Sequence, residues 1–166
     1  MQKILKTFLV GYTAILMANS VYAADAPVLK FLFTIDKFYQ DKLNTPMGVF
    51  VDKGRGEVYL ADSGRSEVLI FDLKGNPLFK FGKVHGVSNP FDLVVKNNKI
   101  YLAQEDKPYI EVFNYRGEAM ARVAPPEGAS FSPGRLVLDE DGSIYVIKIR
   151  LKPTALSLIA RTGLLA

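Results

Sequence analysis

The sequence predicts an all-β protein built from repeated four-stranded units, and three observations lead to that class. Apolar runs of strand length alternate with short turn segments between Pro46 and Gly82. The order of this stretch returns from Pro90 onwards and again, in part, from Pro133. The composition, with 49% hydrophobic and 23% charged residues, is that of a globular chain rather than a disordered one.

The first unit, residues 46–82, holds four apolar runs separated by three turns. The turns contain residues whose backbone adopts turn conformations at low cost. These residues are Gly54 and Gly56, Ser63 and Gly64, and Gly75 and Asn76. Because short turns of this kind join antiparallel neighbours, the unit is predicted to be an antiparallel meander of four strands.

The spacing of the copies indicates what the units build. Landmark residues recur 42 positions apart, as Tyr59 and Tyr101, Phe71 and Phe113, and Gly75 and Gly117. A repeat of about 40–45 residues that holds four strands is typical of a propeller blade. We predict blades at 46–82 and 90–123 and an incomplete blade at 133–148, which makes about two and a half blades of an incomplete ring.

The order of residues within the unit resembles the NHL repeat. The first copy has Pro-x-Gly-apolar at 46–49, Tyr-apolar-Ala-Asp at 59–62, apolar-x-Phe-Asp at 69–72 and Phe-Gly at 81–82. The second copy departs at Gln104, where the family usually has Asp, and the third matches through its first two strands only. The resemblance covers roughly residues 46–148. It implies an NHL-type β-propeller, usually of six blades, from a family whose members mostly bind proteins or RNA and include some enzymes.

The two ends of the chain lack the repeat pattern. Residues 1–23 combine Lys3 and Lys6 with an apolar run and a Val-Tyr-Ala ending, which predicts a signal peptide cut after Ala23. We therefore expect a protein exported to the periplasm or outside the cell, with no membrane segment after cleavage. The alternative is an uncleaved anchor, because the apolar run is close to spanning length. The chain has no Cys, which excludes disulfides and a lipid anchor on Cys.

Two further segments flank the repeats. Residues 28–35 are predicted to be a lone strand that closes the ring, or else an ordinary edge strand. Residues 149–166 form a divergent tail in which 154–162 has the spacing of a short helix. This tail is either the end of a truncated or frame-shifted longer propeller or a divergent cap helix, which terminal repeats often carry.

An incomplete ring also predicts unpartnered apolar faces. We expect one at the first blade, carrying Val58, Leu60, Leu69 and Phe71, and one at the third, carrying Leu136, Leu138 and Ile144. Repeat units need stacked neighbours to bury such faces. We therefore predict that the mature chain alone is not a stable monomer, and that it self-associates to complete the ring, aggregates or is degraded.

The loops on one side of the blades are the longer and more polar ones, and binding normally sits on such loops of a rigid scaffold. The candidate binding residues are Asp62, Arg65, His85, Gln104, Asp106 and Lys107. Asp62 has a structural alternative as an acceptor for backbone N–H groups in its own turn. The partner is expected to be a protein or a glycan. Removing Lys3 and Lys6 from the 21 basic residues leaves 19 against 17 acidic ones, a balance that disfavours nucleic acid.

Enzyme motifs are missing from the sequence. One His and no Cys do not supply the usual zinc sites, and no phosphate-binding loop or nucleophile elbow occurs. We therefore expect no catalytic residue, metal or cofactor, and a non-enzymatic exported binding or scaffold module. The alternatives are a fragment of a six-bladed propeller enzyme, lactonase- or lyase-like with a metal at its hub, and a truncated gene product without function.

Overall fold

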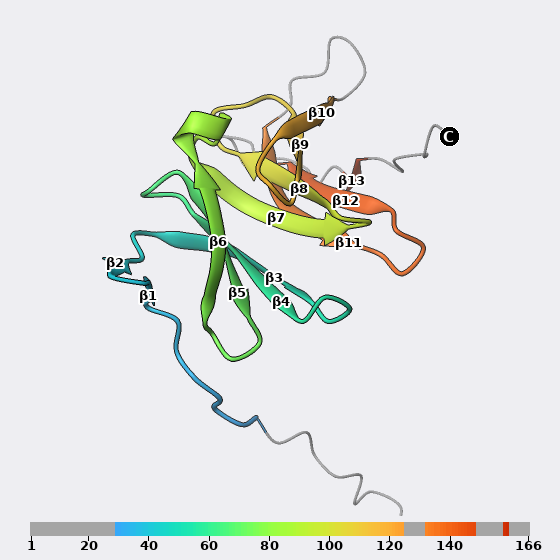
Figure 1. Cartoon of the computed structure of the whole chain (residues 1–166). Helices are drawn as coiled ribbons and strands as arrows, with labels where there is room; N and C mark the ends of the chain where they lie inside the picture. Colours follow the sequence, from blue (N-terminus) through green and yellow to red (C-terminus); the bar gives the residue numbers. More distant parts are fainter. Residues whose placement is uncertain (1–28, 125–131, 149–157, 160–166) are drawn as a thin grey trace, which may run out of the picture. The chain divides into compact units, whose positions relative to one another are not determined.

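The computed structural model describes residues 29–124, 132–148 and 158–159 (Figure 1). The chain divides into two units, residues 1–32 and 33–166. In the first unit only residues 29–32 are described, and they form neither strand nor helix. The predicted signal peptide lies outside the described residues. Within the described part no helix is long and apolar enough to cross a membrane.

The second unit contains the predicted blades. The first blade is a four-stranded sheet in the order β3 (Pro46–Asp52), β4 (Glu57–Asp62), β5 (Glu67–Asp72) and β6 (Pro77–Gly82). A one-turn 3-10 helix, η1 (Lys83–His85), leads to the second blade, which has β7 (Pro90–Lys96), β8 (Lys99–Gln104), β9 (Ile110–Asn114) and β10 (Ala119–Val123). All neighbouring strands in these sheets are antiparallel. The prediction of an all-β chain with two four-stranded blades is confirmed.

The third sheet has three strands within the described residues and differs from the prediction at its end. It contains β11 (Pro133–Leu138), β12 (Ile144–Lys148) and β13 (Leu158–Ile159). The helix predicted over 154–162 is wrong at residues 158–159, which pair antiparallel with β12. The physical reason is that β12 offers an edge of unpaired N–H and C=O groups, and a strand satisfies that edge while a helix does not.

The blades pack through side chains that alternate along each strand. One buried cluster joins the first and second blades, with Tyr59, Ala61, Val68 and Ile70 meeting Leu93, Val95, Ile100, Leu102 and Phe113. A second cluster joins the second and third blades, with Val94, Ala103 and Ile110 meeting Leu136, Ile144 and Val146. The second blade therefore packs against the first blade with one face and against the third blade with the other.

The outward face of the third blade is not the one predicted. Leu136 and Ile144 are buried against the second blade, and Leu138 packs beside them. The exposed positions are Val137 and Ile147, which are 54% and 42% accessible. The prediction failed because side chains alternate with a period of two, so an error of one residue in the register exchanges the buried and exposed sets.

The outward face of the first blade is covered by the chain itself. Residues 33–45, called here the N-terminal cover, include a small hairpin of β1 (Lys37–Phe38) and β2 (Asp41–Lys42). Phe38 is 4% exposed and lies edge-on to Phe71, with ring centroids 5.4 Å apart. It packs in one cluster with Val58, Leu60, Leu69 and Phe71, the residues predicted to be exposed. The expectation of an open first blade is thus corrected for its middle strands.

The innermost strand of the same face remains open. Val49 is 63% and Val51 47% exposed. Their equivalents in the second blade, Leu93 and Val95, are buried against the first blade. The cover therefore replaces a neighbouring blade over β4 and β5 and leaves part of β3 uncovered.

The lone strand predicted over 28–35 does not form in residues 29–35, which contain no strand. A strand forms only where its backbone N–H and C=O groups pair with a neighbouring strand. Downstream, the cover approaches the first blade closely at Gly64. A Cβ atom on Gly64 would stand 2.0 Å from the carbonyl oxygen of Asn44, so this turn position requires glycine.

Candidate functional site

A hollow of about 340 Å³ lies beside the turn that joins β4 to β5 and the short helix η1. We call this end of the blades, where strand two leads into strand three, the upper end. Its side chains come from three places in the sequence. Arg65 lies in the turn before β5 and Glu67 is the first residue of β5. Lys80 lies on β6, and η1 contributes Lys83, Val84 and His85.

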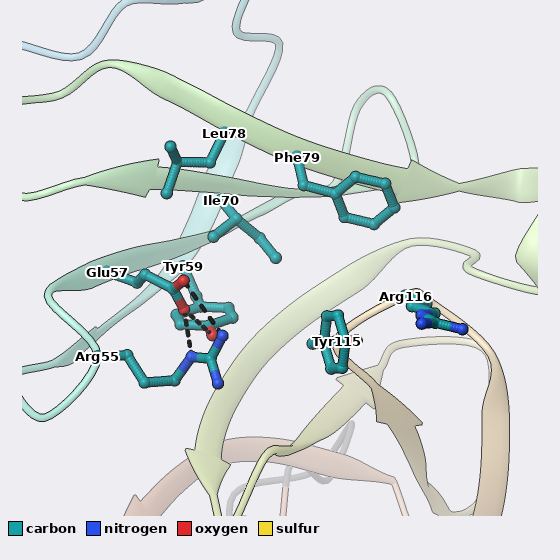
Figure 2. Close-up of a pocket in the computed structure, with 8 residues that line it drawn as sticks. All are labelled: Arg55, Glu57, Tyr59, Ile70, Leu78, Phe79, Tyr115 and Arg116. Carbon is teal, nitrogen blue, oxygen red and sulfur yellow. Dashed lines mark hydrogen bonds and ion pairs between the residues drawn. The ribbon is translucent and has the colours of Figure 1, made fainter.

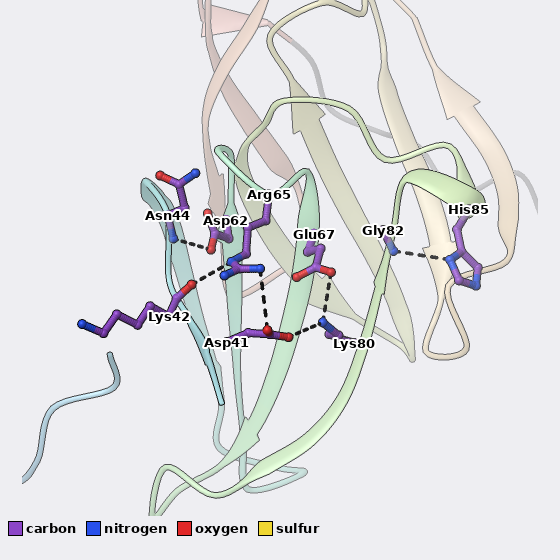
Figure 3. A network of polar contacts seen from close by, with 9 residues as sticks. All are labelled: Asp41, Lys42, Asn44, Asp62, Arg65, Glu67, Lys80, Gly82 and His85. Carbon is purple, nitrogen blue, oxygen red and sulfur yellow. Dashed lines mark hydrogen bonds and ion pairs between the residues drawn. The ribbon is translucent and has the colours of Figure 1, made fainter. Parts of the chain in front are cut away.

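The N-terminal cover holds the cationic groups of this hollow in place (Figure 3). The Lys80 ammonium donates to Glu67 Oε1 at 3.1 Å and to Asp41 Oδ2 at 3.2 Å. Arg65 Nε donates to the carbonyl oxygen of Lys42 at 2.7 Å, and its Nη1 lies 4.0 Å from Asp41 Oδ1. Partial burial would lower the pKa of Lys80, but the hydrogen bonds from Lys80 to Glu67 and Asp41 leave this pKa above its ordinary value. Lys80 is therefore charged at neutral pH.

The charges of the hollow do not cancel. Arg65, Lys80 and Lys83 supply three positive charges, and Asp41 and Glu67 supply two negative ones. Lys83 is exposed and forms no ion pair within the described residues. One positive charge thus faces solvent at the rim, beside the 94% exposed side chain of Val84.

His85 is fixed at the side of the hollow. Its Nδ1 accepts a hydrogen bond from the backbone N–H of Gly82 at 3.3 Å. Its ring stands at 77° to that of Phe81, with the centroids 6.0 Å apart. A neutral imidazole that accepts at Nδ1 carries its proton on Nε2, so this histidine presents a donor to a ligand.

Two of the predicted binding residues are buried inside the fold. Asp62 and Gln104 are both fully buried. Asp62 Oδ2 accepts the backbone N–H of Asn44 at 2.8 Å, and Gln104 Oε1 accepts that of Ser88 at 2.6 Å. The alternative for Asp62, a hydrogen bond within its own turn, is corrected as well, because the donor lies 18 residues upstream. These side chains attach the incoming link to each blade and do not reach solvent.

The other two predicted residues lie at the second blade. The Lys107 ammonium donates to the carbonyl oxygen of Gly86 at 2.5 Å and pairs with Glu111, which also accepts from Gln104 at 3.0 Å. Asp106 is exposed and outside this network. Arg65 and His85 therefore line one hollow. Lys107 pairs with Glu111 within the second blade, and Asp106 lies outside both groups.

Several residues of the hollow were not predicted from the sequence. Lys83 and Val84 belong to the link after the first blade, and their signal was a charged and an apolar residue next to the predicted His85. Lys80 alternates with Phe79 and Phe81 along β6, which places it on the face of the N-terminal cover. Asp41 had no sequence signal, because its role depends on the contact of the cover with the blade. Among the described residues no group of three or more His, Asp or Glu side chains is placed to hold a metal ion.

Comparison with known proteins identifies the class of fold. No protein-family model matches the sequence, and a search of curated proteins gave no match. Among solved structures, hydrazine synthase of Kuenenia stuttgartiensis matches with a TM-score of 0.55 and 14% identity, over 68% of this chain and 32% of that chain. A catalytically inactive virginiamycin B lyase from Staphylococcus aureus, solved with quinupristin, matches with a TM-score of 0.50 and 12% identity, over 63% and 34%.

These neighbours have propeller-type folds, and at such identities the likeness concerns the fold alone. The chain spans about a third of the length of each of them. Together with the repeated four-stranded sheets, the comparisons place this protein among the propeller-type β proteins. The incomplete ring agrees with the partial coverage.

Proposed function

We propose that this chain is an exported, non-enzymatic binding module of the NHL type. Its partner is a protein or a glycan that carries negatively charged groups. The order of residues within its blades supports the NHL assignment. The observation that carries the function is the hollow at the upper end, where Lys83, which has no ion pair among the described residues, and exposed Val84 lie beside Arg65 and His85.

The chemistry of the hollow fits such a partner. An anionic group is attracted by the surplus positive charge and meets the donor on His85. Val84 adds apolar contact area at the rim. Exposed apolar side chains bordered by polar residues are typical of a binding surface. The contacts of Arg65 and Lys80 with the N-terminal cover fix the site before the ligand arrives, so little ordering entropy is lost on binding.

The test uses the purified chain and two acidic probes, a polygalacturonate oligosaccharide for the glycan class and a polyglutamate peptide for the protein class. Biolayer interferometry should detect binding of one of them, weakening as salt rises, because the contact is electrostatic. Lys83→Ala should weaken that binding severalfold. Lys99→Ala, an exposed lysine at the opposite end of the second blade, is the matched control. Absence of binding to both probes, or equal loss in both variants, would contradict the proposal.

Export is part of the same proposal and has its own test. The apolar run of residues 1–23 with its Val-Tyr-Ala ending supports cleavage after Ala23. Sequencing the N-terminus of the exported protein should give Ala24. A protein that still begins at Met1 would show that the segment is retained.

A further inference from the structure

A second hollow opens at the lower end of the blades, where strand one leads into strand two (Figure 2). It has a volume of about 230 Å³ and is lined by both the first and the second blade. Ile70 and Phe79 come from the first blade, and Tyr115 comes from the turn between β9 and β10. Its walls are mainly apolar.

One wall carries a polar group that is already satisfied. Glu57 accepts the Tyr59 hydroxyl at 2.5 Å and Arg55 Nε at 2.7 Å, and Arg55 also donates to Asn98 at 2.9 Å. Burial alone would raise the pKa of Glu57, but the bonds from Arg55 and Tyr59 hold this pKa below its ordinary value. Glu57 therefore stays ionised at neutral pH and compensates the charge of Arg55.

The rim carries a second cation without such compensation. Arg116 is exposed, and no ion pair joins it to an acidic group among the described residues. Its guanidinium carbon lies 5.6 Å from the centre of the Tyr115 ring. Because the negative charge of Glu57 balances the positive charge of Arg55, the hollow keeps one net positive charge, that of Arg116 at its mouth.

Three apolar side chains that line this hollow are exposed. Leu78 is 49%, Phe79 42% and Tyr115 47% exposed. Exposed apolar groups gathered around a concavity and bordered by charge are typical of a binding site. Strand β6 and the turn after β9 thus both contribute exposed apolar side chains to the lining of this pocket.

We propose that this lower hollow binds a small aromatic carboxylate. A cavity of about 150 Å³ lined by apolar side chains accepts benzene, so the volume here has room for one ring and a short acidic arm. The ring packs against Tyr115 and Phe79, where aromatic pairs are favourable. The carboxylate meets Arg116, whose planar guanidinium suits a bidentate contact. This site is separate from the upper hollow and does not depend on the function proposed for it.

The probes are phenylacetate and its neutral isostere phenylacetamide, tested on the full chain by saturation-transfer and amide-shift NMR. We expect transfer to the ring protons of phenylacetate, shifts at Phe79 and Tyr115, and weaker binding of the amide. Arg116→Gln should weaken phenylacetate about threefold, the size of an exposed ion pair, and leave phenylacetamide unchanged. Tyr115→Ala should weaken both probes.

Lys74→Gln is the matched control, because Lys74 is the exposed cation 42 positions before Arg116, at the same turn of the first blade. It should bind phenylacetate as the unmodified chain does. Three outcomes would overturn the proposal: no saturation transfer, equal affinity for the acid and the amide, or the same loss in Lys74→Gln as in Arg116→Gln.

Discussion

Gln104 stands in the second blade where Asp62 stands in the first, 42 residues earlier. Each is buried, and each accepts the backbone N–H of the residue two positions before the proline that opens its blade. The backbone repeats the pattern beside them, since Ser63 donates to Thr45 and Glu105 to Asn89. The change from carboxylate to amide therefore keeps the acceptor that attaches each incoming link.

Truncating this acceptor should destabilise the fold. In Gln104→Ala the N–H of Ser88 loses its partner, and a buried polar group left unsatisfied costs about 1–3 kcal/mol. Asp106→Ala, at an exposed position two residues on, should stay within about 0.5 kcal/mol of the unmodified protein. Urea unfolding measures both variants. Similar stabilities would mean that Gln104 has no structural role.

The N-terminal cover should contribute strongly to stability through Phe38. Phe38→Ala removes a buried ring from the cluster with Phe71, and such truncations cost about 3–5 kcal/mol. Tyr39→Ala, at a neighbouring 64% exposed position, should cost much less. Thermal unfolding and binding of a hydrophobic dye would both report the difference. Equal melting temperatures would refute the role of Phe38.

The third blade provides a test of side-chain register. Val146 faces the second blade and Ile147 faces outward. Val146→Asp should abolish folding of this sheet, because an unpaired charge buried there costs several kcal/mol. Ile147→Asp should leave a folded and more soluble protein. Circular dichroism and the soluble yield distinguish the two variants. If Ile147→Asp abolished folding and Val146→Asp did not, the outward face predicted from the sequence would be the right one.

Because of Asp92, the free energy of unfolding should gain a contribution that increases as the pH falls. Burial raises the pKa of Asp92, although its Oδ2 accepts the N–H of Leu136 at 2.9 Å. A carboxyl group with a raised folded pKa favours the folded state below its unfolded pKa, and this contribution is lost as pH rises through the folded pKa. Relative to Asp92→Asn, the unmodified protein should therefore gain stability as the pH falls from about 7 to about 4.

The measurement is the free energy of unfolding of both proteins across that range. The difference between the two isolates Asp92 from the other carboxyl groups, which titrate in both proteins. A difference that stays constant with pH, or moves the other way, would contradict the assignment of burial as the dominant effect on Asp92.

The sequence predicted the parts of the fold that depend on local pattern. Alternating apolar runs and turn residues located the strands from Pro46 to Val123, and the 42-residue spacing revealed the blades. The hairpin that places Phe38 was not predicted, because its strands have two residues each and carry no periodic signal. The faces of the third blade were misassigned because periodicity separates two faces without indicating which one is buried.

The candidate site was predicted in part for similar reasons. Arg65 and His85 were found as polar residues of loops at one end of the blades. The same pattern predicts Asp62 and Gln104 as binding residues, yet both are buried acceptors. Polarity in a turn does not distinguish a ligand contact from a backbone contact. The lower hollow combines Arg55 and Tyr115, which lie 60 positions apart in the sequence and meet only after two blades have packed.

The central claim is that residues 33–45 cover the first blade as a neighbouring blade would, and cysteine labelling tests it most directly. The chain has no native Cys, so single replacements report accessibility without background. Leu60 and Val49 lie on the same face of this blade, but Leu60 is 8% exposed beneath the cover and Val49 is 63% exposed. In the native protein, Val49→Cys should react rapidly with a maleimide and Leu60→Cys slowly, with rates that become equal in denaturant. Equal rates under native conditions would show that the cover does not lie on the blade.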